Sequence, residues 1–272
     1  MRKLIIEADD FGLSPGINKG IKEVINYGIV RSTNVLINFS YSEEATELQN
    51  FYPNISIGVH INVTCGYPIS DSRKVKSIID PITGEFYGYR DFVKRITHGR
   101  IVLKELETEF IAQMQKALDL GLKITHVNTH HGIHRNPIVF MILLRVCKKF
   151  NITKVRTPKY YYINDVRKSF KYVLKKFSGD FENIYARMKD FKMADNYIVL
   201  KNKDSLENWL ALERIPKRIS EVCCHPGYVD DILKKYTTYI YEREMEVKIL
   251  TSEELLEFLN ERRIELISFR DI

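Results

Sequence analysis

The sequence LIIEADDFG, residues 4–12, decides the fold of this 272-residue chain. Its apolar start, residues 4–6, is typical of a buried strand in a parallel sheet. Two adjacent carboxylates, Asp9 and Asp10, follow directly, and the turn sequence Ser14-Pro15-Gly16 comes soon after them. In α/β folds, sites are built where strands end. The stretch therefore predicts a functional site at the end of the first strand.

The two carboxylates have two interpretations. Successive strand residues point to opposite faces, so Asp9 and Asp10 can point the same way only if the strand ends between them. One of them would then bind a cation while the other acts as a base. Alternatively, Asp10 caps the helix that begins near Ser14, and Asp9 forms a surface ion pair. The two aspartates alone do not decide between these interpretations, so the rest of the sequence must be considered.

The composition is that of an ordinary globular protein, with 44% hydrophobic and 28% charged residues. No apolar run approaches the roughly 20 residues of a membrane helix, and the N-terminus lacks the features of a signal peptide, so a cytoplasmic location is expected. The net charge of +7 is spread along the chain among acidic residues. With no nucleic-acid motif, neither nucleic acid nor membrane is an expected partner. The four cysteines lack CxxC spacing and fit reduced thiols.

Predicted strands and helices alternate from end to end. Strands are predicted at residues 4–6, 29–38, 54–63, 123–129, 152–156, 196–200, 220–224 and 264–268. Helices are predicted at residues 15–27, 43–50, 102–120, 137–150, 205–212 and 251–262, the last opened by a capping box of Thr251 and Glu254. This alternation, with seven or eight mostly parallel strands, predicts an α/β fold, either a β/α barrel or a doubly wound sheet. No linker or repeat divides residues 1–272, so a single domain is expected.

Two segments do not follow this alternation. Residues 66–100 are long and irregular, which predicts a lid-like or substrate-binding excursion. The alternative is a structural insertion that covers one edge of the barrel. Residues 159–193 are aromatic and basic, are expected to be helical in places, and carry no identifiable chemistry.

Six of the seven histidines lie at or beside predicted strand ends: His60, His126, His130, His131, His134 and His225. His60 shares a strand face with Gly58 and Asn62, while His126, Asn128 and His130 share a face of another strand. Beyond that strand, His131 and His134 can return towards the same point as the chain turns. The alternative for His60, as a lone histidine on a strand, is a hydrogen-bonded core residue, and the alternative for residues 126–134 is a polar loop. The clustering at strand ends instead favours one shared site.

One carboxylate and two histidines around an open position are a common catalytic set for zinc and other divalent ions. Three strand ends supply such a set: Asp10, His60 and His130. Asp9 and His225 then remain as a base and an acid beside the metal, which suits hydrolysis. Arg156, at a further strand end, would hold the carboxylate base ionised. The alternative interpretation is that Arg156 is an ordinary surface residue at a strand end.

Taken together, these residues resemble the YdjC-like carbohydrate deacetylases, also called the chitooligosaccharide deacetylase type. The resemblance covers nearly the full length and preserves the family's order of motifs. The matching blocks are ADDFGLSPGINKGI (8–21), GVHINVT (58–64), HVNTHHGIH (126–134), VRTP (155–158), CCHPGYVD (223–230) and IELISFRDI (264–272). Each block alone is weak evidence, whereas the ordered set is specific.

The resemblance implies a distorted β/α barrel that binds one divalent metal ion, Mg²⁺ first, with Zn²⁺ or Co²⁺ as alternatives. It implies removal of the acetyl group from N-acetylglucosamine units of short β-linked oligosaccharides. By position, the implied metal ligands are Asp10, His60 and His130. Asp9 would be the base, His225 the acid and Arg156 the partner of the base, although the two aspartates could exchange roles. The expected partner is a small acetylated amino sugar, and a homodimer is left open.

The chain departs from the family pattern at four positions. The family usually has Asp-Ser-His-His-His where this chain has Asn-Thr-His-His-Gly at residues 128–132, and often Asn where Glu7 stands. Losing the acidic residue at Asn128 would change how a histidine ligand is oriented, and Gly132 would widen the pocket. Because the ligand positions are intact, the departures bear on the substrate more than on the reaction.

Four aromatic residues of the irregular segment are candidates for a sugar platform, or else pack as covers: Tyr67, Phe86, Tyr87 and Tyr89. Two other functions stay open. One is metal-dependent hydrolysis of another bond, such as a phosphoester. The other is a non-catalytic, sugar-binding or metal-storing relative whose site has decayed at Asn128 and Gly132.

Overall fold

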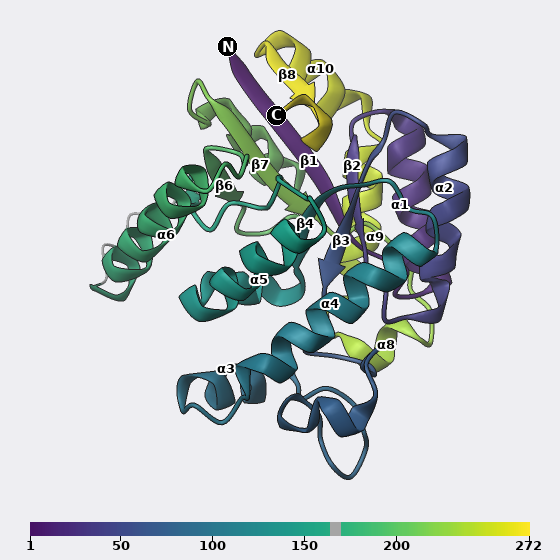
Figure 1. The fold of residues 1–272 in the computed structure, drawn as a ribbon. Coiled ribbons are helices and arrows are strands. Elements are labelled where there is room, and N and C mark those ends of the chain that lie inside the picture. The colour runs from purple at the N-terminus through teal and green to yellow at the C-terminus, as the bar shows by residue number, and fades with distance from the viewer. Residues whose placement is uncertain (164–169) are drawn as a thin grey trace.

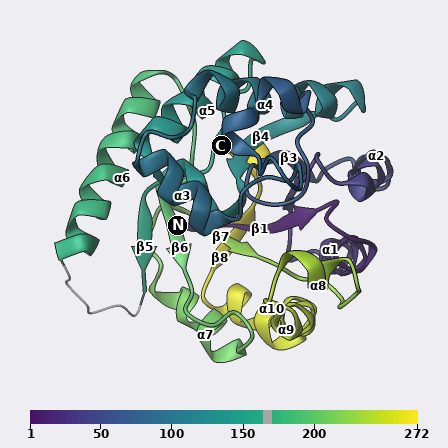
Figure 2. The ribbon, with the colours of Figure 1, turned by 90° about the horizontal axis from the view of Figure 1, so that it is seen from below.

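The structure, a computed structural model, describes residues 1–163 and 170–272, and no side chain of residues 164–177 is described. One sheet of parallel strands curls through the molecule, and helices surround it (Figures 1 and 2). The strands are β1 (Arg2–Phe11), β2 (Ser32–Val35), β3 (Ser56–Ile61), β4 (Ile124–Thr129), β5 (Tyr160–Tyr162), β6 (Asn196–Val199), β7 (Ile219–Cys224) and β8 (Ile264–Ile267). Their order is β4-β3-β2-β1-β7-β6-β5, and β8 pairs with the start of β1. The predicted α/β class is confirmed.

The helices lie around the strands, which Figure 2 shows from the carboxyl-end side. They are α1 (Pro15–Tyr27), α2 (Ala45–Phe51), α3 (Tyr89–Thr97), α4 (Leu103–Asp119), α5 (Pro137–Lys149), α6 (Phe170–Met188), α7 (Leu206–Leu210), α8 (Leu233–Tyr236), α9 (Tyr241–Leu250) and α10 (Glu253–Glu261). In α1 the Ser14 side chain accepts a hydrogen bond from the Ile17 amide, and Gly28 ends the helix in the left-handed region. In the part of the chain that the structure describes, no helix is long and apolar enough to cross a membrane.

Hydrogen bonds outside the regular strands close the sheet towards a barrel. The Val127 amide in β4 donates to the Lys154 carbonyl at 3.0 Å, and the Val155 amide donates to the Lys192 carbonyl at 3.1 Å. The Asp195 amide then donates to Ile219 in β7 at 2.8 Å. A hydrogen-bonded circuit thus runs from β4 through residues 153–156 to the other side of the sheet. This distorted closure agrees with the predicted barrel.

The sequence prediction was wrong in two of its elements. The strand predicted at residues 152–156 is reduced to isolated bridges at Lys154 and Val155, and β5 lies instead at residues 160–162. The capping box predicted at Thr251 is absent from α10, where the Ser252 side chain accepts the Leu255 amide. Thr251 instead donates to the Val247 carbonyl in α9, a helix that the sequence analysis did not predict. The N-cap of α10 is therefore Ser252, one residue later than the sequence predicted.

The irregular segment 66–100 lies beyond the carboxyl ends of the strands, at the bottom of Figure 1. It contains short 3₁₀ turns and α3, and α4 holds it in place. The buried Glu109 carboxylate accepts the amides of Ile69 and Ser70 at 3.0 and 2.9 Å, and Glu105 accepts the Ser77 amide at 2.6 Å. A carboxylate that accepts backbone amides fixes the loop that carries them. A lid function for this segment stays a prediction.

Candidate active site and metal centre

A bulge in β1 brings both aspartates to one side. Ala8 pairs with Thr33 and Phe11 pairs with Val35, so three steps along β1 match two along β2. Such a bulge inserts one residue and redirects a side chain. Asp10 takes the extra step in the left-handed region, with φ of 76°. Both carboxylates therefore line one pocket, although the strand continues to Phe11. In a strand without a bulge, two successive side chains would point to opposite faces.

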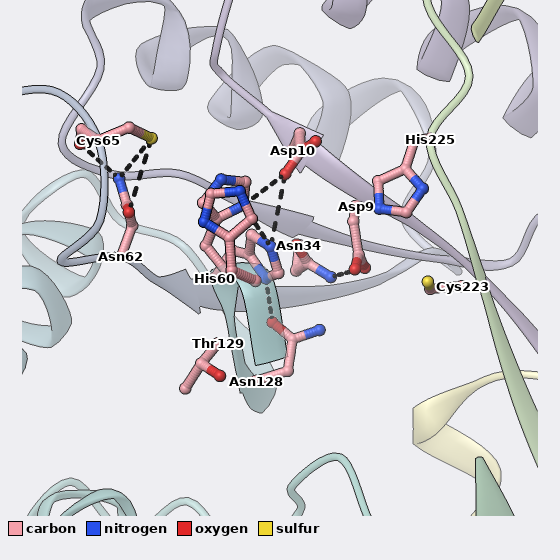
Figure 3. A network of polar contacts seen from close by, with 12 residues as sticks. Asp9, Asp10, Asn34, His60, Asn62, Cys65, Asn128, Thr129, Cys223 and His225 are labelled. Atoms are coloured by element: carbon pink, nitrogen blue, oxygen red, sulfur yellow. Dashed lines mark hydrogen bonds and ion pairs between the residues drawn. The ribbon is translucent and has the colours of Figure 1, made fainter. Parts of the chain in front are cut away.

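The three predicted metal ligands converge from β1, β3 and the end of β4. Figure 3 labels two of them, Asp10 and His60. Asp10 Oδ1 lies 3.0 Å from His130 Nδ1 and 3.5 Å from His60 Nε2, and the two ring nitrogens are 3.3 Å apart. Ligand atoms around one divalent ion bound at about 2.1 Å are separated by roughly 3.0–3.4 Å. Asp10 Oδ1 is buried and has no hydrogen bond of acceptable geometry to a described residue. The three side chains therefore fit a divalent metal ion.

The second oxygen of Asp10 is held by Arg243, a residue that the sequence analysis missed. Arg243 Nη2 donates to Asp10 Oδ2 at 2.8 Å, and both side chains are buried. Burial alone would raise the pKa of Asp10, but His130 and Arg243 outweigh it and hold this pKa well below its ordinary range. Asp10 is thus an ionised carboxylate with one oxygen fixed and the other free for a metal.

A signal for Arg243 was present in the sequence. Arg243, Glu246, Val247 and Leu250 are buried on one face of α9 at helical spacing. Two charged residues on an otherwise apolar face indicate buried ionic partners. Without a predicted helix over residues 241–250, this pattern could not be recognised.

Arg156 binds Asp9 with two parallel hydrogen bonds, as the sequence predicted for the partner of a carboxylate. Nη1 donates to Asp9 Oδ2 and Nη2 donates to Asp9 Oδ1, each at 2.8 Å, and Asn34 donates to Oδ1 at 2.6 Å. Burial alone would raise the pKa of Asp9, but the Arg156 guanidinium outweighs it and keeps this pKa far below its ordinary value. Arg156 also donates to Glu7 at 2.6 Å and to Glu221 at 2.5 Å. It is therefore a buried residue and not a surface one.

His225 lies beside Asp9 at the end of β7, next to a lysine that the sequence analysis did not single out. Asp9, Cys223 and His225 offer ligand atoms within 4.8 Å of one another, but Lys203 Nζ lies 3.1 Å from Cys223 Sγ and 3.5 Å from His225 Nδ1. The lysine ammonium supplies a positive charge at this cluster, which disfavours a second metal ion there. Burial, and then Lys203, lowers the pKa of His225 well below its ordinary value.

The remaining histidines divide between the pocket and the core. His131 lines the pocket, and its Nδ1 lies 2.9 Å from the Thr64 hydroxyl. His134 is buried against Thr129, so it does not return to the metal ligands as the turn suggested. His126 is buried as well, bonded to Glu7 and stacked on Phe269. His126 and His134 are therefore buried, hydrogen-bonded core residues, an outcome that the sequence analysis had considered only for His60.

The candidate catalytic and metal-binding side chains line a pocket of about 590 Å³. Its aromatic lining is Tyr160, Tyr197, Tyr236 and Tyr239. The four aromatic residues proposed as a sugar platform do not line it: Phe86 is buried in the core, and Tyr89 lines a neighbouring cavity of about 250 Å³. The platform prediction is therefore wrong for this pocket. The sequence analysis did not single out the tyrosines that line the pocket, because they lie between residues 160 and 239, far along the chain from the segment 66–100.

Comparison with known proteins assigns a family to this geometry. Residues 3–261 match the family described as YdjC-like protein. The chain belongs to this family. Curated relatives named carbohydrate deacetylase include one from Thermoanaerobacter pseudethanolicus, 31% identical over 99% of this chain and 98% of the relative, and one from Clostridium beijerinckii, 32% identical over 99% and 100%. The sequence prediction of a carbohydrate deacetylase family, whose members are hydrolases, is confirmed.

A solved structure agrees with this assignment. It is the crystal structure of a protein from Enterococcus faecalis V583, named as a candidate cellobiose-phosphate cleavage protein. The YdjC-like chain superposes on it with a TM-score of 0.83 and 28% identity, covering 99% of this chain and 98% of the other. The shared fold therefore extends over the whole length of both chains.

Proposed function

We propose that the chain is a metal-dependent deacetylase that removes the N-acetyl group from N-acetylglucosamine units of short oligosaccharides such as N,N′-diacetylchitobiose. One observation carries the proposal. The ligand atoms of Asp10, His60 and His130 converge on one point, beside a second pair of titratable groups, Asp9 and His225. The names of the curated relatives support the sugar amide as the bond that is cleaved.

The ligand set limits the choice of ion. Two imidazole nitrogens and one carboxylate oxygen suit Zn²⁺ or Co²⁺ better than Mg²⁺, which prefers oxygen ligands. The family resemblance implied Mg²⁺ first, so the choice of ion is part of the test. A bound divalent ion would polarise the acetyl carbonyl as a Lewis acid and lower the pKa of a bound water.

The protein side chains would handle the protons. Asp9 Oδ2 accepts a hydrogen bond from Arg156, and a carboxylate oxygen has a second acceptor direction, which suits proton abstraction from the attacking water. Arg156 orients this base and keeps it ionised. His225, with a ring nitrogen within 4.8 Å of an Asp9 oxygen, would deliver a proton to the leaving sugar amine.

The test is acetate release from N,N′-diacetylchitobiose by chelator-treated protein, with Mg²⁺, Zn²⁺ or Co²⁺ added back. Release restored by one ion is expected. Asp10→Asn and His130→Ala should lose both bound metal and activity, because each removes a ligand. His98→Ala, an exposed histidine in the irregular segment, is the matched control and should keep both. Full activity and metal content in both ligand variants would overturn the proposal.

Two further measurements on the same protein, phosphoester turnover and sugar binding, separate the two alternatives. Phosphoester turnover without acetate release would indicate a metal-dependent phosphoesterase. Tight binding of the sugar without any turnover, at saturating metal, would indicate a non-catalytic relative. A cytoplasmic location stays a prediction of the sequence, and a homodimer stays open.

A further inference from the structure

A buried hydrogen-bond chain joins the proposed base to a proposed metal ligand. Arg156 Nη2 donates both to Asp9 Oδ1 and to Glu7 Oε2, at 2.8 and 2.6 Å. Asn128 Nδ2 donates to the same Glu7 oxygen at 3.3 Å, and Asn128 Oδ1 lies 2.5 Å from His60 Nδ1 (Figure 3). Glu7 and Asn128 have no solvent exposure. The two residues are therefore the inner links of a continuous chain.

The donor and the acceptor of each hydrogen bond from Glu7 to His60 follow from the protonation state of Glu7. The pKa of Glu7 is lowered to about 2, because His126 and Arg156 outweigh its burial, so Glu7 is an ionised carboxylate that can only accept. Asn128 must then turn its NH₂ group to Glu7 and its carbonyl oxygen to His60. His60 in turn must carry its proton on Nδ1, which leaves the Nε2 lone pair facing Asp10 and His130.

The surrounding packing fixes Glu7 on its other side. His126 Nε2 bonds to Glu7 Oε1, and the His126 ring stacks on Phe269 with centroids 3.9 Å apart. A Cβ at Gly58 would lie 2.5 Å from His126 Nε2, so only glycine leaves room for this ring. Because both oxygens of Glu7 have fixed partners, Asn128 has one orientation available.

We propose that Glu7 and Asn128 form a positioning pair that sets the metal-binding tautomer of His60, and that the pair works only as one carboxylate and one amide. Asn128→Asp would place two carboxylates where a 3.3 Å hydrogen bond now lies, and their repulsion would displace the acceptor of His60. In the double variant Glu7→Gln with Asn128→Asp, an amide again faces a carboxylate. A carboxylate oxygen at position 128 then accepts the hydrogen bond from His60 Nδ1.

The inference rests on the proposed metal site, and its main readout is the dissociation constant of Zn²⁺ or Co²⁺ for the chelator-treated protein. We expect Asn128→Asp to weaken metal binding by about tenfold or more, as is usual for residues that orient metal-bound histidines. The double variant removes the repulsion and should recover part of this loss, because its glutamine amide would also face Arg156 Nη2, which now donates to Glu7 Oε2 at 2.6 Å. Asn183→Asp, which alters a buried amide bonded to Thr157, is the matched control and should keep the metal affinity of the unmodified protein.

The tautomer itself gives a second readout that folding alone would not change. In ¹⁵N spectra of labelled histidine, the metal-free protein should show His60 protonated on Nδ1, and Asn128→Asp should disturb this signal. Failure of the unmodified protein to bind any divalent ion would overturn the proposed function. Metal binding that is normal in the unmodified protein and equally tight in Asn128→Asp would overturn only the positioning pair.

Discussion

The Arg156 guanidinium donates to both carboxylate oxygens of Asp9, at 2.8 Å each, and both buried side chains lie at the wall of the candidate active-site pocket. The same guanidinium contacts Glu7 and Glu221, so one cation faces three carboxyl groups. Burial raises the pKa of Glu221 well above its ordinary range, since Arg156 does not offset both burial and the neighbouring Glu7. Glu221 is thus expected to be protonated, which leaves the charge of Arg156 for Asp9 and Glu7.

The first prediction concerns the geometry of this pair. Arg156→Lys keeps a positive charge but cannot bind both oxygens of Asp9, because an ammonium lacks the planar fork of a guanidinium. We expect kcat to fall on the order of 100-fold with little change in KM, since a misplaced base affects the chemical step. Steady-state acetate release measures both constants. Arg145→Lys, an exposed ion pair with Glu107, is the control. An unchanged kcat in Arg156→Lys would remove Arg156 from the mechanism.

Much of the site could be predicted because of where its residues lie in the chain. Asp9, Asp10, His60, His130 and His225 each fall at or just beyond a strand end. The carboxyl ends of parallel strands meet at the same edge of a sheet, so position along the chain predicts proximity in space. This rule holds even for Arg156, although its strand proved to be only a pair of isolated bridges.

The rest depends on contacts that no local pattern encodes. The bulge at Asp10 arises from its register against β2, and a sequence pattern does not report register. Lys203 and Glu221 become relevant only because β7 and the segment after β6 pack against β1 and Arg156. The consequence of the departure at Asn128 could be seen only in the structure. The amide oxygen of Asn128 faces His60 Nδ1, so the hydrogen-bond acceptor is kept although the carboxylate is lost.

A second prediction tests the space reserved for His126. Gly58→Ala would place a methyl group 2.5 Å from His126 Nε2, a distance that real contacts do not reach. Because Phe269 stacks on His126, the ring cannot move without breaking its bond to Glu7. We expect a loss of about 2–3 kcal/mol in the free energy of unfolding, measured with urea. Gly88→Ala, where a Cβ meets nothing within 4 Å, is the control. Equal stability of the two variants would contradict the packing argument.

A third prediction concerns the pH dependence of catalysis. The Lys203 ammonium, second to burial, lowers the pKa of His225. Lys203→Met removes this positive charge, so the pKa of His225 should rise and its imidazolium should persist to higher pH. If His225 is the proton donor, the alkaline limb of the kcat profile moves to higher pH.

The control for this experiment is Lys201→Met, an exposed lysine at the same pocket. Its profile should match that of the unmodified protein. A shift of the acidic limb in Lys203→Met would instead assign His225 as the base. An alkaline limb that does not move would contradict the role of His225 as the acid.

The fourth prediction concerns stability and lies outside the catalytic pocket. Glu182 on α6 is buried beside the smaller cavity and accepts a 2.8 Å hydrogen bond from Ser178. Burial raises its pKa from 4.5 to about 7. The folded state therefore prefers the neutral acid. The stability that this preference contributes is fully present below about pH 4.5 and is lost as the pH rises through 7.

Glu182→Gln replaces the acid with a neutral group at every pH. The variant should match the unmodified protein at pH 5 and exceed its free energy of unfolding at pH 8, by about 1 kcal/mol after allowance for solvent screening. Urea unfolding at the two pH values measures the difference. Glu257→Gln, an exposed glutamate on α10, should show no such pH dependence. An equal advantage of Glu182→Gln at both pH values would contradict a raised pKa of Glu182. It would mean that the carboxyl group is already ionised in the folded protein at pH 5.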